Sequence, residues 1–163
     1  MTHYKLQIEE NDEDSFLLLA IHCSEEPYKM AFMLNKNLNI NLKRKRMDIE
    51  IVAKKMTTSY AIFEFENPQE YTHFYLVENK CTLQSDTNFQ KGSLFALDHS
   101  EKIRRVHLLP EFKKADFFLK IETDIELFPI RKVLAQMNAI REVISAYVIE
   151  NQNIKSYNNL IFN

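Results

Sequence analysis

The chain has 163 residues and a formal net charge of −2, and hydrophobic residues make up 45% of it. This length suits a single domain over residues 1–163 with a core of its own, and the hydrophobic content argues against intrinsic disorder. The slightly acidic balance gives the chain no general attraction to nucleic acid or to anionic lipid.

Glycine usage excludes two large classes of nucleotide enzyme. Gly92 is the only glycine of the chain. The phosphate-binding loops of dinucleotide-binding and P-loop proteins need several backbone positions without a Cβ atom. A chain with one glycine lacks the material for either loop.

Cysteine usage and the length of the apolar runs bear on location. Cys23 and Cys81 are far apart, and no secretory signal pattern precedes the first predicted strand. We therefore expect a cytoplasmic protein with reduced thiols. The longest apolar run, Phe16–Ile21, is too short to cross a bilayer, so we expect no contact with a membrane.

The N-terminal part of the chain predicts two strands and a helix. Residues 4–8 alternate apolar and polar side chains, which is typical of a short strand, and the acidic run 9–14 is interpreted as a solvated loop rather than a metal site. The continuous apolar run Phe16–Ile21 indicates a central strand that is covered on both faces. Apolar residues recur at helical spacing over Pro27–Leu38, which predicts a helix with one core-facing stripe.

From Ile40 onward the sequence favours a β-meander. Side chains of shared parity define three strand faces: Ile49, Ile51 and Ala53; Ala61, Phe63 and Phe65; Phe74 and Leu76. Asn67-Pro68 marks the turn between the last two of these strands. Residues 78–94 are polar and predict a long connection, and residues 93–97 favour a further strand.

The C-terminal part predicts another strand, a helix and a last segment that fits two structures. Residues 115–121 are an apolar strand, and apolar residues recur at helical spacing over 129–137. Residues 143–149 are rich in β-branched and aromatic side chains, so we interpret them as a strand. The same residues also fit a continuation of the helix through Ile140, Ile144 and Tyr147, and periodicity leaves both open.

Two strand–helix–strand units therefore flank a meander. This order predicts an α+β fold, with two helices packed on one face of a mainly antiparallel sheet and a ferredoxin-like or elaborated ferredoxin-like topology. Strand parity places Phe118 and Lys120 on one face of their strand. The residues expected on the opposite face are Ala115, Phe117, Leu119 and Ile121.

Lys43, Arg44, Lys45 and Arg46 form the strongest basic run. Four basic side chains on an extended segment can contact the phosphates of RNA, with nearby tyrosines as stacking faces. Basic residues also guard the edge of a sheet against pairing with another chain. We favour the edge role, because the chain is slightly acidic and no RNA-binding motif accompanies the run.

No arrangement of residues is typical of catalysis or of metal binding. The five histidines are scattered, and the cysteines lack the spacing of structural zinc ligands, so we expect neither a metal nor a cofactor. His22 and Cys23 are adjacent on a strand and point to opposite faces, which excludes a direct dyad. Glu111 is interpreted as a turn residue, and Asp116 as a group that bonds the backbone or Lys113/Lys114 where a strand begins.

The stretch that contains these two acids resembles a known signature. Pro110-Glu111 and, three residues later, Ala115-Asp116-Phe117 resemble the signature of the IPExxxVDY family, small proteins of the Bacteroidota with no assigned activity. Leu109, Ala115 and Phe117 stand where the family has Ile, Val and Tyr. The six motif positions are Leu109, Pro110, Glu111, Ala115, Asp116 and Phe117.

The resemblance extends over nearly the whole chain. Tyr28–Lys36 is similar to the N-terminal helix of the family, and Lys155–Phe162 is similar to its C-terminal motif. The resemblance implies a cytoplasmic bacterial protein, and it provides no catalytic residue and no cofactor.

Three functional hypotheses follow, and the first is preferred. It is a cytoplasmic, non-enzymatic interaction or adaptor domain that binds a protein partner or itself, since apolar Leu160–Phe162 has to cover the core, an edge or another subunit. The second is an RNA-associated accessory protein that uses Lys43–Arg46. The third is an enzyme or small-ligand-binding domain in which His22, Glu111 and Asp116 converge in one pocket.

Overall fold

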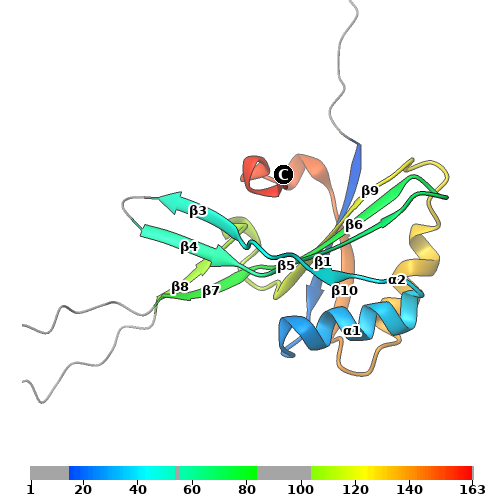
Figure 1. Ribbon diagram of the computed structural model, residues 1–163, viewed down its shortest axis with the longest axis horizontal. Coiled ribbons are helices and arrows are strands. Elements are labelled where there is room, and N and C mark those ends of the chain that lie inside the picture. Colours follow the sequence, from blue (N-terminus) through cyan, green and yellow to red (C-terminus); the bar gives the residue numbers. More distant parts are fainter. Residues whose placement is uncertain (1–14, 54–55, 84–103, 163) are drawn as a thin grey trace, which may run out of the picture.

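The computed structural model describes residues 15–53, 56–83 and 104–162 (Figure 1). The predicted strand at 4–8, the acidic run 9–14, the predicted strand at 93–97 and most of the connection 78–94 lie outside the described residues.

Strands dominate the described part of the chain. The strands are β1 (Phe16–His22), β2 (Lys43–Arg44), β3 (Ile49–Ala53), β4 (Met56–Tyr60), β5 (Ile62–Asn67), β6 (Thr72–Glu78), β7 (Lys80–Leu83), β8 (Arg104–His107), β9 (Phe117–Glu122) and β10 (Ser145–Ile149). The α-helices are α1 (Pro27–Leu38) and α2 (Ile130–Asn138), and the 3₁₀ turns are η1 (Pro110–Phe112), η2 (Asn151–Asn153) and η3 (Tyr157–Leu160).

Six of the strands form one antiparallel sheet in the order β10-β1-β9-β6-β5-β2. The α+β prediction is therefore confirmed. The units β1–α1–β6 and β9–α2–β10 interleave their strands in the order β10-β1-β9-β6, which is the ferredoxin-like arrangement, and β5 and β2 extend the sheet beyond β6. The predicted meander is interrupted, because β3 and β4 pair with each other and leave the main sheet.

Residues 145–149, which the sequence left open between two structures, form a strand and do not continue helix α2. Helix α2 ends at Asn138, and β10 begins at Ser145 and pairs with β1 over its whole length. Ile149 packs into the core, whereas Tyr147 and Val148 remain exposed, so the pairing with β1 rather than burial of every apolar side chain marks this segment as a strand.

Both faces of the sheet are covered. Helices α1 and α2 pack on one face through side chains such as Leu34 and Met137. The C-terminal segment, red in Figure 1, lies across the other face together with η1 and buries Leu109 and Leu160 there. Because of this double cover, strand β1 is buried on both sides, as its continuous apolar sequence predicted.

Strand parity in β9 is as predicted, with one exception. Phe117, Leu119 and Ile121 pack toward the helices, and Phe118 packs on the opposite face. Ala115 was expected with the first group but lies in the second cluster. It precedes β9 in a turn whose backbone does not alternate, so parity does not reach it.

The two edges of the sheet are protected in different ways. Strand β2 ends one side with two residues, the exposed Lys43 and Arg44. On the other side of the sheet, the backbone N–H and C=O of Ala146 in β10 point away from β1. The side chain of Asn138 forms a hydrogen bond with each of these two groups. The Ala146 N–H donates to Oδ1 at 2.9 Å, and Nδ2 donates to the Ala146 carbonyl at 2.9 Å. A charged end and a covering side chain are two known means of blocking edge pairing.

We expect Asn138→Ala to open the β10 edge. The substitution leaves the outward N–H and C=O of Ala146 without their side-chain partner, which should cost about 1 kcal/mol and expose a short apolar edge. Sedimentation velocity over a range of concentrations should show self-association that the unmodified chain lacks at the same concentrations. Asn37→Ala, which removes one bond to the Met33 carbonyl inside α1, is the control. Identical sedimentation of the Asn138 and Asn37 variants would contradict the protective role.

Candidate functional site

Asp116 joins three parts of the fold. Its Oδ2 accepts the N–H of Cys23 at 2.9 Å, and its Oδ1 forms an ion pair with Lys80 of β7. Its own N–H donates to the Ile21 carbonyl at 2.9 Å. The expected lysine partners, Lys113 and Lys114, are both exposed. Lys80 holds the carboxylate instead, because the N–H of the neighbouring Asn79 donates to the Asp116 carbonyl and brings Lys80 close.

Glu111 fastens the C-terminal segment. Its Oε1 accepts the backbone N–H groups of Lys155 and Ser156 at 2.7 and 2.8 Å, and its Oε2 accepts the Ser156 hydroxyl at 3.0 Å. Burial acts to raise the pKa of Glu111, but the hydrogen bonds from Ser156 and Lys155 favour the ionised form more strongly and hold the pKa below its usual value.

Asn79 was not predicted from the sequence as a functional residue. Its side chain organises the loop that contains Glu111 and leads to Asp116. The residue is fully buried, and its Nδ2 donates to the carbonyls of Phe112 and Ala115 at 3.0 and 2.8 Å. Its Oδ1 accepts the Leu109 N–H at 3.0 Å, and its backbone carbonyl accepts the Leu108 N–H at 2.8 Å. Every polar group of this buried side chain is used, so its role is to fix η1.

The six motif positions thus form a junction between strands and the C-terminal segment. Leu109, Ala115 and Phe117 are buried, and Pro110 is exposed at the first position of η1. The three groups of the pocket hypothesis have separate partners: His22 Nε2 lies 3.3 Å from the Tyr147 hydroxyl, whereas Glu111 and Asp116 bond the groups named above.

The basic run lies at the β2 edge, and much of its charge is compensated. Arg44 pairs with Asp48 and lies over the ring of Phe63, with its guanidinium carbon 5.7 Å from the centroid. Lys45 Nζ lies 3.1 Å from a carboxylate oxygen of Glu64. Burial acts to raise the pKa of Asp48, but its bonds from Arg44 and Ser59 lower it overall. Arg44 and Lys45 therefore attract phosphates less than unpaired basic side chains would, while Lys43 and Arg46 are exposed at the same edge.

Lys120 lies on the Phe118 face of β9, as strand parity predicted, but its burial was not predicted from the sequence. Lys120 is 6% exposed, and its Nζ lies 4.9 Å from the ring centroid of Phe16, 5.3 Å from that of Phe162 and 5.7 Å from that of Tyr75. A carboxylate oxygen of Glu122 lies 2.5 Å from the same ammonium. Three rings and one carboxylate stabilise the buried charge and tie the C-terminal Phe162 to the sheet.

Tyr75 completes this cluster. Its hydroxyl lies 3.1 Å from Nδ1 of His73, and burial, together with Glu122, Glu64 and Glu66, raises the pKa of Tyr75 to about 12. The phenol therefore stays protonated at neutral pH and serves the structure through its hydrogen bond and its ring.

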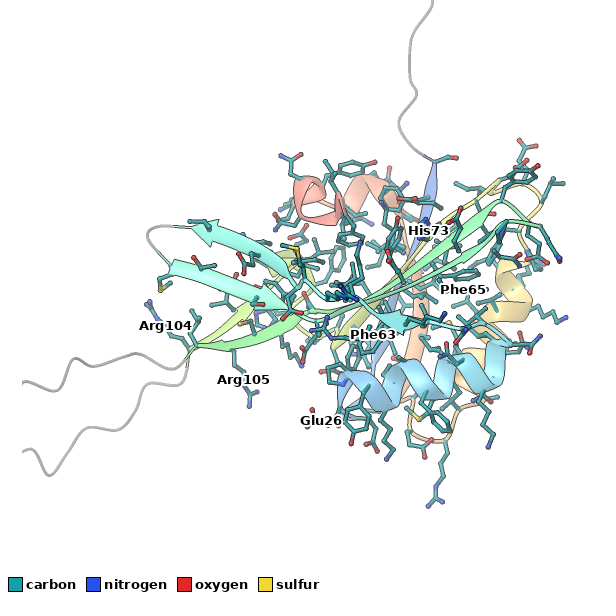
Figure 2. The ribbon with its side chains drawn as sticks, in the orientation of Figure 1. Glu26, Phe63, Phe65, His73, Arg104 and Arg105 are labelled. Carbon is teal, nitrogen blue, oxygen red and sulfur yellow. The ribbon has the colours of Figure 1, made fainter. Side chains whose placement is uncertain are left out.

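Two adjoining hollows lie at the end of the sheet formed by the β5–β6 turn. We call the first the apolar groove: it measures about 770 Å³ and lies between the C-terminal end of α1, that turn and the β9–α2 connection. We name it for its apolar side chains, which include Ile40, Phe74, Leu127, Phe128 and Val133. Polar side chains, among them Asn39, Gln69 and Gln136, form about half of its wall. Figure 2 shows His73 at this end of the molecule, whereas Arg104 and Arg105 lie on the hairpin that projects from the opposite end.

The second hollow, which we call the acidic hollow, measures about 640 Å³ and is lined by Glu66, His73, Glu122 and Asp124 among others. The two hollows share part of one wall, in which the hydroxyl oxygens of Thr72 and Thr123 lie 2.9 Å apart. An extended peptide that lies along this end of the sheet can therefore contact both hollows.

The rims of the apolar groove are exposed and apolar. Tyr71 is 90% exposed and Leu127 is 82% exposed, the two largest values among the exposed large hydrophobic side chains of the described residues. Tyr71 has a left-handed backbone with φ 49°, which is unfavourable for a residue with a Cβ atom. The turn before it is braced, since Asn67 Oδ1 accepts the Gln69 N–H at 3.2 Å.

Within residues 15–53, 56–83 and 104–162, no group of three or more His, Cys, Asp or Glu side chains is placed to hold a metal ion. No helix of the same residues is long and apolar enough to cross a membrane. Comparisons with protein-family models, curated proteins and solved structures found no match for the chain. The resemblance of residues 109–117 to the IPExxxVDY signature stays a prediction from the sequence.

We expect Asp116→Ala to lower the free energy of unfolding by about 1–3 kcal/mol, because a backbone donor and Lys80 both lose a charged partner. Asp116→Asn keeps an acceptor for the Cys23 N–H but removes the charge. Its free energy of unfolding should therefore lie between those of the unmodified chain and Asp116→Ala. Urea unfolding followed by circular dichroism measures all three proteins. An unchanged midpoint in the alanine variant would overturn the structural role.

The Glu111 carboxylate should make stability depend on acid pH. Because its pKa is lowered in the folded chain, its contribution is complete above the pKa of an unfolded glutamate and is lost as the pH falls through the folded value. Relative to Glu111→Gln, the unmodified chain should therefore lose more stability between about pH 5 and pH 3. Urea unfolding at several pH values gives the comparison, with the exposed Glu126→Gln as the control. Parallel pH profiles for the unmodified chain and Glu111→Gln would contradict the expectation.

Proposed function

We propose that the chain is a non-enzymatic interaction domain that binds an extended segment of a partner protein in the apolar groove. One observation carries the proposal: the two most exposed large hydrophobic side chains of the described residues, Tyr71 and Leu127, stand on separate elements that border the same groove. Exposed apolar side chains that flank a hollow are typical of interaction sites, whereas single ones scattered over a surface are not.

The shape of the site favours a protein segment over a small molecule. Small ligands bind in concave sites that bury most of their surface. The apolar groove and the acidic hollow share Tyr71, Thr72, Thr123 and Asp124, so the two together suit an occupant that is longer than either hollow alone. Apolar anchor side chains that enter such a groove are a common mode of peptide recognition.

The absence of enzymatic activity is part of the proposal. The two hydroxyls in the wall shared by the hollows, Thr72 and Thr123, bond each other. Tyr75 and the buried Lys120 are packed among rings beneath the C-terminal segment and serve the core. A cytoplasmic location is also part of the proposal and is supported by two free cysteines, Cys23 and Cys81.

The other two hypotheses receive less support from the geometry. Arg44 and Lys45 have acidic partners, which weakens the case for RNA. His22, Glu111 and Asp116 each engage different groups, which weakens the case for a catalytic pocket built from them. We therefore retain the protein-binding role alone.

A selection of random peptides by display on phage, with the full chain as bait, tests the proposal. An enriched peptide is synthesised, and its Kd is measured by calorimetry. We expect the double variant Tyr71→Asn/Leu127→Ser to bind it at least about tenfold more weakly, since burying one such side chain contributes about 1.5–3 kcal/mol. Asparagine tolerates the left-handed backbone at position 71.

The matched control is Met47→Ser/Val52→Ser, which removes two similarly exposed apolar side chains outside the groove. It should bind the peptide as the unmodified chain does. Enrichment of no peptide, or equal binding by the two double variants, would overturn the proposal.

A further inference from the structure

We infer that the partner segment carries a lysine or arginine next to its apolar anchor and that the acidic hollow receives this cation. The inference rests on the proposed function and specifies the chemistry of the partner.

The charges around the two hollows are one-sided. The residues that line the acidic hollow include Glu66, Glu122 and Asp124 but no lysine or arginine. Around the apolar groove Glu70 and Asp124 face a single basic residue, Lys132. Glu122 is already paired with Lys120, so it adds little. Three carboxylates, those of Glu66, Glu70 and Asp124, thus remain against one ammonium along the path of a bound segment.

Aromatic and hydroxyl groups add to the fit for a cation. Tyr71 borders both hollows, and its exposed ring can receive an ammonium or guanidinium group on its face. Ser15 lines the acidic hollow, and the Thr72 and Thr123 hydroxyls form its shared wall, so acceptors for N–H donors lie next to the carboxylates.

The contiguity of the hollows favours a side chain of the bound segment over a free cation. A metal ion would need several converging ligands, and within the described ranges no three His, Cys, Asp or Glu side chains are so placed. In an extended peptide, side chains on one face recur about every 7 Å. An apolar anchor in the groove and a basic residue two positions away can therefore occupy both hollows at once.

The test measures the Kd of one peptide pair against two proteins. The first peptide is a selected one that carries a basic residue near its apolar anchor, and in the second that residue is replaced by Gln. At low salt the unmodified chain should prefer the basic peptide by about tenfold, because several weak exposed pairs act together, and added salt should reduce this preference.

The triple variant Glu66→Gln/Glu70→Gln/Asp124→Asn should bind the two peptides equally. Asparagine at 124 keeps the Oδ1 acceptor for the Glu126 N–H, so the connection that holds Leu127 is preserved. The control Glu50→Gln/Glu142→Gln changes two exposed carboxylates that do not line either hollow and should retain the preference.

The outcomes separate this inference from the proposed function. If the enriched peptides lack basic residues, or if the Gln peptide binds as tightly as the basic one while the Tyr71/Leu127 variant still loses binding, the inference falls and the groove stands. If the Tyr71/Leu127 variant binds normally, both fall. Concentration-dependent self-association of the unmodified chain that the rim variant abolishes would identify a second copy as the occupant and overturn the partner segment.

Discussion

Burying both faces of the interior strands is the constraint on which the rest of the structure depends. Strands β1 and β9 are buried on both sides, and two helices can cover only one face of their sheet. The other face is covered by segments with little regular structure, which have few backbone bonds of their own to hold them. Polar side chains supply the missing bonds: Asn79 fixes η1, and Glu111 binds the C-terminal segment. The motif residues are therefore explained by architecture.

The same constraint accounts for a charge in the core. Phe16, Tyr75 and Phe162 enclose the ammonium of Lys120, and Glu122 neutralises it. Removing Glu122 would leave the buried ammonium without its carboxylate, whereas the complete cluster is tolerated and specific in geometry. The cluster thus favours one position for the ring of the C-terminal Phe162, whereas apolar contacts alone would permit several positions.

The sequence allowed the elements to be predicted better than the surfaces. Helices α1 and α2, strand β1 and the alternation in β9 depend on neighbours along the chain, so periodicity was sufficient for them. It was insufficient for Ala115, because the parity of a strand does not extend into the turn before it. The meander was predicted as continuous, but β3 and β4 pair only with each other and not with the main sheet. Such a departure depends on the packing of the whole sheet, which periodicity along the chain does not describe.

The candidate site was not predictable in the same way. The apolar groove takes its walls from the end of α1, the β5–β6 turn and the β9–α2 connection, which are far apart in the sequence. The partners of Asp116 and Lys120 are likewise distant, and only the ion pair with Glu122 is local. The sequence did contain two unusual features. Lys120 interrupts an otherwise apolar strand, and Asn79 directly follows strand β6.

In the proposed role, the left-handed backbone of Tyr71 sets stability and recognition against each other at one position. Glycine or asparagine would relax the turn, and a chain under selection for folding alone would gain from either. A large ring that is 90% exposed gives the folded chain almost no burial in return. Strain that the free molecule does not use is characteristic of sites where the benefit comes only with the ligand.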